Sequence, residues 1–390
     1  MDAATYTSRI IKSFADLRAS EWNALDGAYH PFLRYEFFLS LEQNGNLNHA
    51  SGWDCRLVCL FDKHNGSDRL IAAMPMFLKD HSWAEFVFDW AWANSYAQHG
   101  IAYYPKLVVT TPYTPASARK CLTHPQLGQE YLASKLIQTA MDHAKHEAVS
   151  SLHALFLTDT EQVIWQEHGL LKRIDVQFHW QNRWQDKQDA CFDDFLARMT
   201  SSKRKKIRQE RRSIQKQHVD LKIQKANEID PELWQDIYQC YANTFLLRGQ
   251  TPYFSKELFL DLANSMGEQM PIIQAFQNNL LLGTAICFQS NEVLYGRYWG
   301  KMADINNLHF ETCFYQTIDY ALHQKLKHIE PGTGGTHKLR RGFEPTLTTS
   351  MHWIAHEGFR DAIADHLQRE HKAILEYKED AKGHLPFKQK

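Results

Sequence analysis

The stretch Asn279-Leu-Leu-Leu-Gly-Thr-Ala-Ile-Cys-Phe288 decides the fold expected for this chain, because an earlier stretch of the chain is similar to it. Arg69-Leu-Ile-Ala-Ala-Met-Pro-Met-Phe77 has a comparable apolar run, and each run follows a polar turn, at 277–279 and at 65–68. Apolar runs bounded by turn residues are typical of buried strands. The similarity predicts that one α/β domain occurs twice.

Each half continues with strands, one long helix and a further strand. In the first half we expect helices at 128–147 and 161–168, and strands at 56–61, 70–78, 85–92, 103–109 and 151–157. In the second half we expect a helix at 310–325, and strands at 270–276, 280–289, 293–299 and 328–330. Polar residues without periodicity at 182–189 separate the halves, which predicts one domain at 1–190 and a second at 191–390.

The composition is that of a globular protein. Hydrophobic residues make up 44% of the chain, and 44 basic side chains stand against 45 acidic ones, so net charge excludes no class of partner. The seven cysteines include no CxxC pair, which is typical of a reducing compartment. No apolar stretch has the length of a membrane span or of a secretory leader, so we expect a cytoplasmic protein without integral membrane association.

The richest site motif is Glu330-Pro-Gly-Thr-Gly-Gly-Thr-His-Lys-Leu-Arg-Arg-Gly-Phe-Glu-Pro345. Glycines let a backbone approach a ligand closely, and histidine is the commonest proton carrier near neutral pH. We therefore expect His337 to act as a general base or to orient the substrate, with Lys338 and Arg341 stabilising anionic oxygens. The alternative is a surface turn followed by a charged strand.

A basic run, Ser201-Ser-Lys-Arg-Lys-Lys-Ile-Arg-Gln-Glu-Arg-Arg212, begins the second half. It holds seven basic residues and one acid, and as a helix it would carry a positive stripe. We expect Lys203, Arg204 and Arg208 to bind an anionic substrate such as a nucleotide, a lipid pyrophosphate or RNA. The alternative is a solvated helix face.

Further candidates lie on the expected strands and in the segment after residue 300. Arg297 and Trp299 alternate on a central strand, where a charged side chain needs a partner or a ligand. His309 and Glu311 would face one way on an extended segment, His309 binding substrate and Glu311 binding the acceptor amine. With Cys313 or His337 they could instead hold a metal, but the spacing matches no standard zinc pattern, so we predict no metal site.

In the first half, charged and aromatic side chains gather between residues 89 and 106. Aromatic faces can bind a base or a sugar ring, although such residues are more often core. The candidate binding residues are Asp89, Trp90, Tyr104 and Lys106, together with His179 and Trp180 just before the boundary.

Several of these motifs resemble one family. They include Glu85-Phe-Val-Phe-Asp-Trp-Ala-Trp92, Leu294-Tyr-Gly-Arg-Tyr-Trp-Gly300 and His337-Lys-Leu-Arg-Arg-Gly-Phe343, with shorter motifs at 30–33, 73–79, 103–106, 177–180, 192–196, 202–205, 308–311 and 352–355. From about residue 25 to about residue 368 the chain is similar to the FemAB-like group of the GNAT acyltransferase superfamily. The resemblance implies an α/β fold with mixed sheets, built as tandem GNAT-like domains with an inter-domain groove.

The resemblance also implies acyl transfer to an amine, from aminoacyl-tRNA or from acyl-CoA, as in peptidoglycan biosynthesis or N-acetylation. The GNAT pyrophosphate turn is missing, because Asp304-Ile-Asn-Asn-Leu-His309 stands where glycines are usual. We therefore expect an aminoacyltransferase that uses aminoacyl-tRNA as a co-substrate, acts on a small-molecule or peptide amine, and has no permanently bound cofactor and no DNA partner. The alternatives are an acyl-CoA-dependent N-acyltransferase and a non-catalytic RNA- or nucleotide-binding protein on the same fold.

Overall fold

The computed structural model describes residues 6–64 and 66–388. The chain divides into two compact units, residues 1–175 with 347–376, and residues 176–346 with 377–390. This division differs from the predicted boundary at 190, because the chain enters the second unit at Val176 and returns to the first at Leu347. Strands β9 (Leu171–Gln181) and β15 (Glu344–Ile354) and helix α12 (Glu357–Gly383) therefore each have residues in both units.

The return of the chain to the first unit has a physical cause. The end of β15 pairs antiparallel with β8 (Ser151–Leu157), from Met351 opposite Ala154 to Ile354 opposite Ser151. The apolar side of α12 then buries Ile363 and Leu367 in a cluster with aromatic residues of the first unit. Burial of that surface is favourable only after segments far apart in the chain have met. Local sequence patterns do not predict such contacts.

The first unit has two sheets, with strand orders β1-β3-β4-β7 and β15-β8-β6-β5-β2. Helix α4 (Gln129–His146) packs Leu132, Leu136 and Ile137 against the strands. Strand β6 precedes this helix in the chain and β8 follows it, and the two strands pair in parallel. The other elements of this unit are β1 (Tyr6–Ile11), α1 (Ala19–Asn23), α2 (Tyr35–Gln43), β2 (Asp54–Cys55), β3 (Leu57–His64), β4 (Ser67–Met74), β5 (Met76–Lys79), α3 (Trp90–Gln98), β6 (Lys106–Val109), β7 (Leu122–Thr123) and α5 (Asp159–Glu167).

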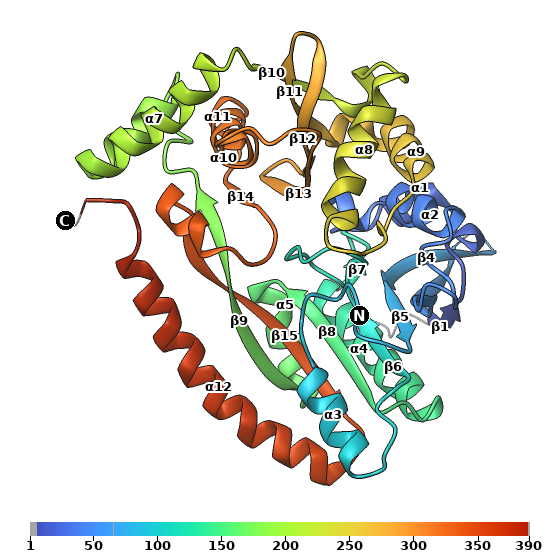
Figure 1. The fold of residues 1–390 in the computed structure, drawn as a ribbon. Helices are drawn as coiled ribbons and strands as arrows, with labels where there is room; N and C mark the ends of the chain where they lie inside the picture. Colours follow the sequence, from blue (N-terminus) through green and yellow to red (C-terminus); the bar gives the residue numbers. More distant parts are fainter. Residues whose placement is uncertain (1–5, 65, 389–390) are drawn as a thin grey trace. The chain divides into compact units, whose positions relative to one another are not determined.

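In the second unit the strand order is β10-β11-β12-β13-β14-β9; β13 and β14 are parallel, and the other described pairs of this order are antiparallel. A helical segment connects these two strands and lies against the sheet (Figure 1). It comprises α10 (Leu308–Phe310), a π-helical turn (Glu311–Tyr315) and α11 (Gln316–His323). The other elements are α6 (Phe192–Ala197), α7 (Ser201–Lys216), β10 (Asp220–Lys225), α8 (Leu233–Leu246), α9 (Lys256–Met266), β11 (Pro271–Gln277), β12 (Leu280–Gln289), β13 (Val293–Lys301), β14 (His328–Glu330) and a 3-10 turn (Thr336–Arg341).

The two units share an order of elements, which confirms the predicted α/β class. The hairpin of β3 and β4 corresponds to that of β11 and β12, and in each unit a later pair of parallel strands is connected through a helix. The expected helices at 128–147 and 161–168 and the basic helix are confirmed, as are the strands at 151–157, 280–289 and 328–330. Asn65, in the expected turn at 65–68, lies outside the described residues.

Three sequence predictions of local structure were wrong. The segment 85–92 is a loop leading into α3, because Glu85 and Asp89 turn inward to a buried lysine and Phe86 takes a positive φ of 63°. The expected strand at 70–78 is divided at Pro75 into β4 and β5. His309 and Glu311 lie on helical backbone rather than on an extended segment, so they do not face one way.

Candidate functional site

A small cavity lies where β13 and β14 separate. The two strands pair only between Val293–Tyr295 and His328–Glu330. Beyond this point β13 bulges, because Ile286 is opposite Tyr298 while Cys287 is opposite Gly296, which leaves Arg297 as the extra residue. The chain after Glu330 turns away, and a cavity of about 320 Å³ fills the gap.

Glycines shape the loop that closes this cavity. Gly332, Gly334 and Gly335 have φ values of 83°, 69° and 85°, a region that other residues adopt only with strain. A Cβ at Gly335 would lie 2.6 Å from Cε1 of His337. The glycine at this position therefore allows the imidazole to lie against the loop backbone.

The small cavity brings together five of the residues predicted for the site. Arg297 and Trp299 come from β13, His309 from α10, and His337 and Lys338 from the 3-10 turn. Sequence reasoning missed Thr244 and Arg248, which line the same cavity from the end of α8. Little in the sequence marks these two residues as site residues, because Leu246-Leu-Arg-Gly249 resembles an ordinary helix end.

His337 combines partial burial with an unused nitrogen. Burial lowers the pKa of His337 below its usual 6.5, and the positive charges of Lys338 and Arg341 lower it further. Within the described residues, its Nε2 is buried and has no hydrogen-bond partner. The ring is therefore a neutral imidazole at pH 7 that lines the cavity, with a buried nitrogen that no described residue pairs.

The pKa values of Lys338 and His309 are also lowered by burial. Burial lowers the pKa of Lys338 to about 8, and its Nζ donates to the carbonyl oxygens of Gly332 at 2.7 Å and Thr333 at 3.2 Å. This geometry makes Lys338 a support of the glycine loop. Burial lowers the pKa of His309 to about 4, so its ring, packed against Trp299, is neutral.

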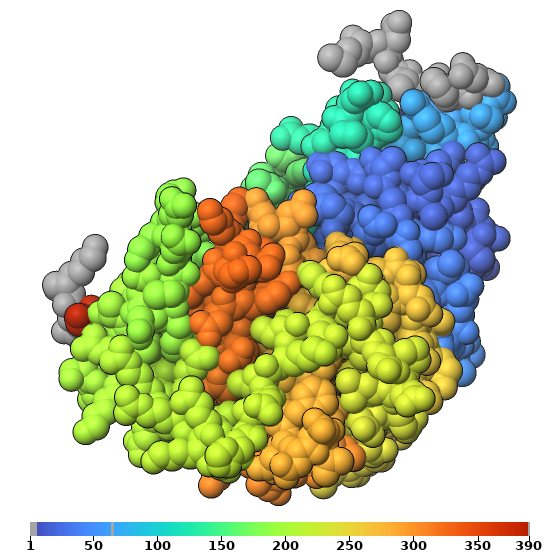
Figure 2. Space-filling model, turned by 90° about the horizontal axis from the view of Figure 1, so that it is seen from above, coloured from blue at the N-terminus to red at the C-terminus, as the bar shows by residue number. Residues whose placement is uncertain are grey.

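A larger cavity of about 930 Å³ shares His337 with the small one. Lys203, Lys206 and Glu210 line it from α7, Arg340 and Arg341 from the 3-10 turn, and Tyr377, Asp380 and His384 from the C-terminal segment. Figure 2 shows the lime-green surface of the α7 region adjoining the orange surface of residues near 310–340. Four cations against two carboxylates make this cavity positive.

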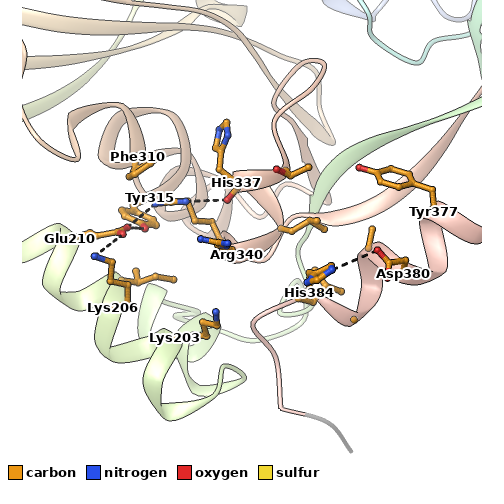
Figure 3. A pocket seen from close by; sticks show the side chains of 17 residues that line it. Lys203, Lys206, Glu210, Phe310, Tyr315, His337, Arg340, Tyr377, Asp380 and His384 are labelled. Atoms are coloured by element: carbon orange, nitrogen blue, oxygen red, sulfur yellow. Dashed lines mark hydrogen bonds and ion pairs between the residues drawn. The ribbon is translucent and has the colours of Figure 1, made fainter. Parts of the chain in front are cut away.

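Within the larger cavity, some cations are already paired and others are not. Arg341 is buried, stacks on Phe310 at 3.3 Å and donates to Glu210 and to the carbonyl of His337. Among the described residues, Lys203 and Arg340 have no ion pair. Figure 3 shows the imidazole of His337 directed away from Lys206 and Glu210, so only its backbone faces that group.

The remaining candidates from the second unit lie outside both cavities. Glu311 is buried and accepts from Arg211 at 3.1 Å and from Gln316 at 2.8 Å, which explains its position without a substrate. Arg208 pairs with the exposed Asp193 at 2.8 Å. Three more candidates, Arg204 on α7 and His179 and Trp180 on β9, are absent from the residues that line the cavities.

Two candidates of the first unit, Asp89 and Lys106, belong to a buried charge cluster. Lys106 is fully buried and donates to Glu85 at 2.8 Å and to Asp89 at 2.5 Å, and Tyr103 donates to Asp89 at 2.6 Å. Burial opposes ionisation of Asp89, but the charge of Lys106 holds the pKa of its carboxyl below the usual range. This cluster explains Asp89 and Lys106 by folding, whereas Tyr104 is half-buried and Trp90 is 45% exposed.

A histidine pair extends this cluster and predicts a pH effect on stability. Nδ1 of His153 lies 2.6 Å from Nδ1 of His352, and burial lowers the pKa of His153 to about 3. Since the unfolded chain binds protons near pH 6.5 and the folded pair does not, the free energy of unfolding should fall as pH drops from 6.5 towards 3. Burial raises the pKa of Glu85 to about 7, which opposes part of this trend above pH 4.5.

Urea unfolding at several pH values measures the slope of stability between pH 3 and pH 6.5. The double variant His153→Gln, His352→Gln should have a shallower slope than the wild type, whereas the double variant His323→Gln, His384→Gln, which changes two exposed histidines, should keep the wild-type slope. Equal slopes in all three proteins would contradict the assignment.

The comparisons with known proteins agree with this architecture. The model of the FemAB-like family, described as peptidoglycan biosynthesis/recognition, matches residues 13–389. The chain belongs to the FemAB-like family. It is therefore an enzyme of the acyl- or aminoacyltransferase class. No curated protein matches the chain significantly.

One solved structure, FemX, shares the fold of this chain at low sequence identity, and two further structures are similar to it over most of its length. FemX is 9% identical with a TM-score of 0.52, and the match covers 92% of this chain and all of FemX. L-PGS from Bacillus licheniformis is also 9% identical, with a TM-score of 0.48 and coverage of 84% and 94%. A tandem GNAT protein from the clavulanic acid biosynthesis pathway is 10% identical, with a TM-score of 0.40 and coverage of 90% and 98%. Within the described residues, no helix has both the length and the apolar character that crossing a membrane requires.

Proposed function

We propose that this FemAB-like enzyme transfers an aminoacyl group from aminoacyl-tRNA to a primary amine in the small cavity. The observation that carries the proposal is the position of His337, which lines both the small cavity and the larger positive one. The small cavity has room for an aminoacyl ester and the end of an amine. The larger one suits the phosphates of the tRNA end that carries the ester.

The chemistry follows from the residues of the small cavity. The amine nitrogen attacks the ester carbonyl, a C–N bond forms, and the C–O bond to the ribose breaks. Nε2 of His337 accepts the proton that the attacking amine loses and returns it to the leaving ribose oxygen. Arg297 lines the same cavity and remains a cation, so it is the group proposed to stabilise the carbonyl oxygen as it gains negative charge.

The loop before α10 disfavours a CoA donor. Asn307, with a φ of 68°, precedes the helix, and Asp304 in the same loop forms an ion pair with Lys301. A carboxylate there would repel a pyrophosphate, and the loop lacks the glycines that bring backbone N–H groups to one. RNA instead requires several cations spread along a surface, which α7 and the 3-10 turn provide.

The acceptor is proposed from the description of the family. Peptidoglycan precursors with a peptide amine are the class that the description favours. Aminoacyl-tRNA would serve as a co-substrate rather than a bound cofactor, and its use would place the reaction in the cytoplasm.

A transfer assay tests the proposal. The purified protein is incubated with radiolabelled aminoacyl-tRNAs and a set of primary amines, including peptidoglycan precursor peptides, and the amide product is followed. Parallel reactions contain acetyl-CoA and longer acyl-CoAs. Amide formation from aminoacyl-tRNA supports the proposal, whereas turnover with acyl-CoA and none with tRNA would replace it by acyl-CoA-dependent N-acylation.

The larger cavity predicts a salt-dependent change in tRNA binding. The double variant Lys203→Ala, Arg340→Ala removes two cations that are not in ion pairs among the described residues. Each phosphate contact contributes about 0.7 to 0.9 to the slope of log affinity against log salt, so the slope should fall by about 1 to 2. Arg18→Ala with Lys372→Ala removes two exposed cations elsewhere and should leave the slope unchanged. Equal slopes in the two double variants would show that tRNA does not use this cavity.

A further inference from the structure

A second group of side chains lies on the sheet of the second unit, among residues that line neither cavity. His179 is on β9, and His328 and Glu330 are on β14. One ligand atom from each of the three lies within 4.8 Å of the other two.

The strand register brings these residues to one face. β14 and β9 are antiparallel, with His328 opposite Gln181 and Ile329 opposite Trp180. Extending the register by one residue places Glu330 opposite His179. Because side chains alternate along a strand, His328 and Glu330 share a face, and the residue opposite each points to that same face. The sequence His328-Ile-Glu330 therefore presents two potential ligands to His179.

The geometry around the three side chains suits a cation. His179 is buried, and its ring lies nearly parallel to that of His328, with the ring centroids 6.1 Å apart. Nε2 of His328 lies 3.3 Å from Oε1 of Glu330, close to the distance of about 3.4 Å between two ligands of one tetrahedral ion. Nε2 of His179 also lies 3.1 Å from Oε1 of Gln177, a contact that fixes the ring, as groups next to metal ligands do.

We propose that His179, His328 and Glu330 bind one divalent transition-metal ion, and that Zn²⁺ fits this set best. Two imidazoles and one carboxylate form a three-ligand set that zinc accepts, with a fourth position left to water or another ligand. Access is available because the side chain of His328 is 26% exposed.

The position of the site gives the ion a structural consequence. It would link β9 to β14 at the last paired residues before Pro331, which begins the loop that lines the small cavity. A bound ion would therefore hold the start of the glycine loop. The proposed site is formed by side chains of this chain alone, and it does not depend on the identity of the acyl donor.

Metal binding by the full-length, tag-free protein tests the site. After treatment with a chelator, the protein is titrated with Zn²⁺ by calorimetry and with Co²⁺ by visible absorption, which reports a tetrahedral site. We expect one equivalent to bind, a higher thermal midpoint, and weaker binding at acidic pH as the imidazoles are protonated. Gln177→Ala should weaken binding about 10- to 100-fold, and His179→Gln or Glu330→Gln by more.

A matched control comes from a second group of three residues, at the C-terminal end of α4, of which His146 and Glu147 are exposed. His143, His146 and Glu147 could also hold an ion at the surface, so the variant His143→Gln, His146→Gln is tested in parallel. It should retain the stoichiometric site. Circular dichroism of the metal-free variants shows whether each is folded, and Glu330→Gln provides a second test if His179→Gln is not. The proposal is overturned if the wild type binds no equivalent of Zn²⁺ or Co²⁺, or if only the α4 variant loses it.

Discussion

Replacing His337 with alanine should lower kcat/KM for amide formation by about 100- to 10,000-fold, the range that a positioned general base contributes. The variant removes the neutral imidazole whose Nε2, among the described residues, has no hydrogen-bond partner. Binding of tRNA should change little, because the larger cavity receives the backbone of His337 rather than its ring (Figure 3). Steady-state kinetics together with a gel shift separates the two quantities.

The matched control is His323→Ala, which removes an exposed histidine at the end of α11. It should keep the wild-type rate. A His337→Ala enzyme that retains more than about a third of wild-type kcat/KM would exclude His337 as the general base. A loss of tRNA binding equal to the loss of activity would instead assign His337 to donor binding.

The pH profile of the wild type is a second readout of the same assignment. Burial and the charges of Lys338 and Arg341 lower the pKa of His337, so its protonation should reduce kcat/KM only below pH 6.5. This acid limb should be absent from the residual activity of His337→Ala.

Lys106→Ala should destabilise the protein by about 3 to 5 kcal/mol, which is the cost of removing one partner from a buried ion pair. The variant leaves the carboxylates of Glu85 and Asp89, which are 2% and 3% exposed, without their shared cation. Urea unfolding monitored by fluorescence and circular dichroism measures the change in the free energy of unfolding.

Two controls separate the buried charge from the loss of a lysine. Lys63→Ala breaks an exposed pair with Asp68 and should cost much less, because exposed ion pairs are screened by solvent. The triple variant Lys106→Met, Glu85→Leu, Asp89→Asn removes the charges together and should recover most of the stability, because the amide oxygen introduced at position 89 can still accept from Tyr103. If Lys106→Ala were as stable as Lys63→Ala, the buried cluster would not hold its charges as described.

Parts of the candidate site could be found from the sequence because they lie within short motifs. The glycine-rich run containing His337 and Lys338, and the strand bearing Arg297, both reach the small cavity. The same reasoning selected Glu311 as a site residue, but its carboxylate accepts a hydrogen bond from Arg211 instead. A pattern shows that a charged side chain needs a partner, but not whether the partner is a ligand or another residue of the chain.

Other parts of the site could not be found locally. Tyr377 and His384 reach the larger cavity from the C-terminal segment, and Arg248 reaches the small one from a helix end. Nothing in their neighbouring residues distinguishes them from ordinary surface positions.

The sequence by itself determined the α/β class and the repeated order of strands and helix, because apolar periodicity and turn residues act over short distances. The family followed from the resemblance of its motifs. Only the tertiary structure decided which residues share a unit or a cavity. It returned 347–376 to the first unit, buried Asp89 on Lys106, and placed His179 beside His328 and Glu330. These outcomes depend on strand pairing and burial between segments far apart in the chain, and their free energy is gained only when the whole fold forms.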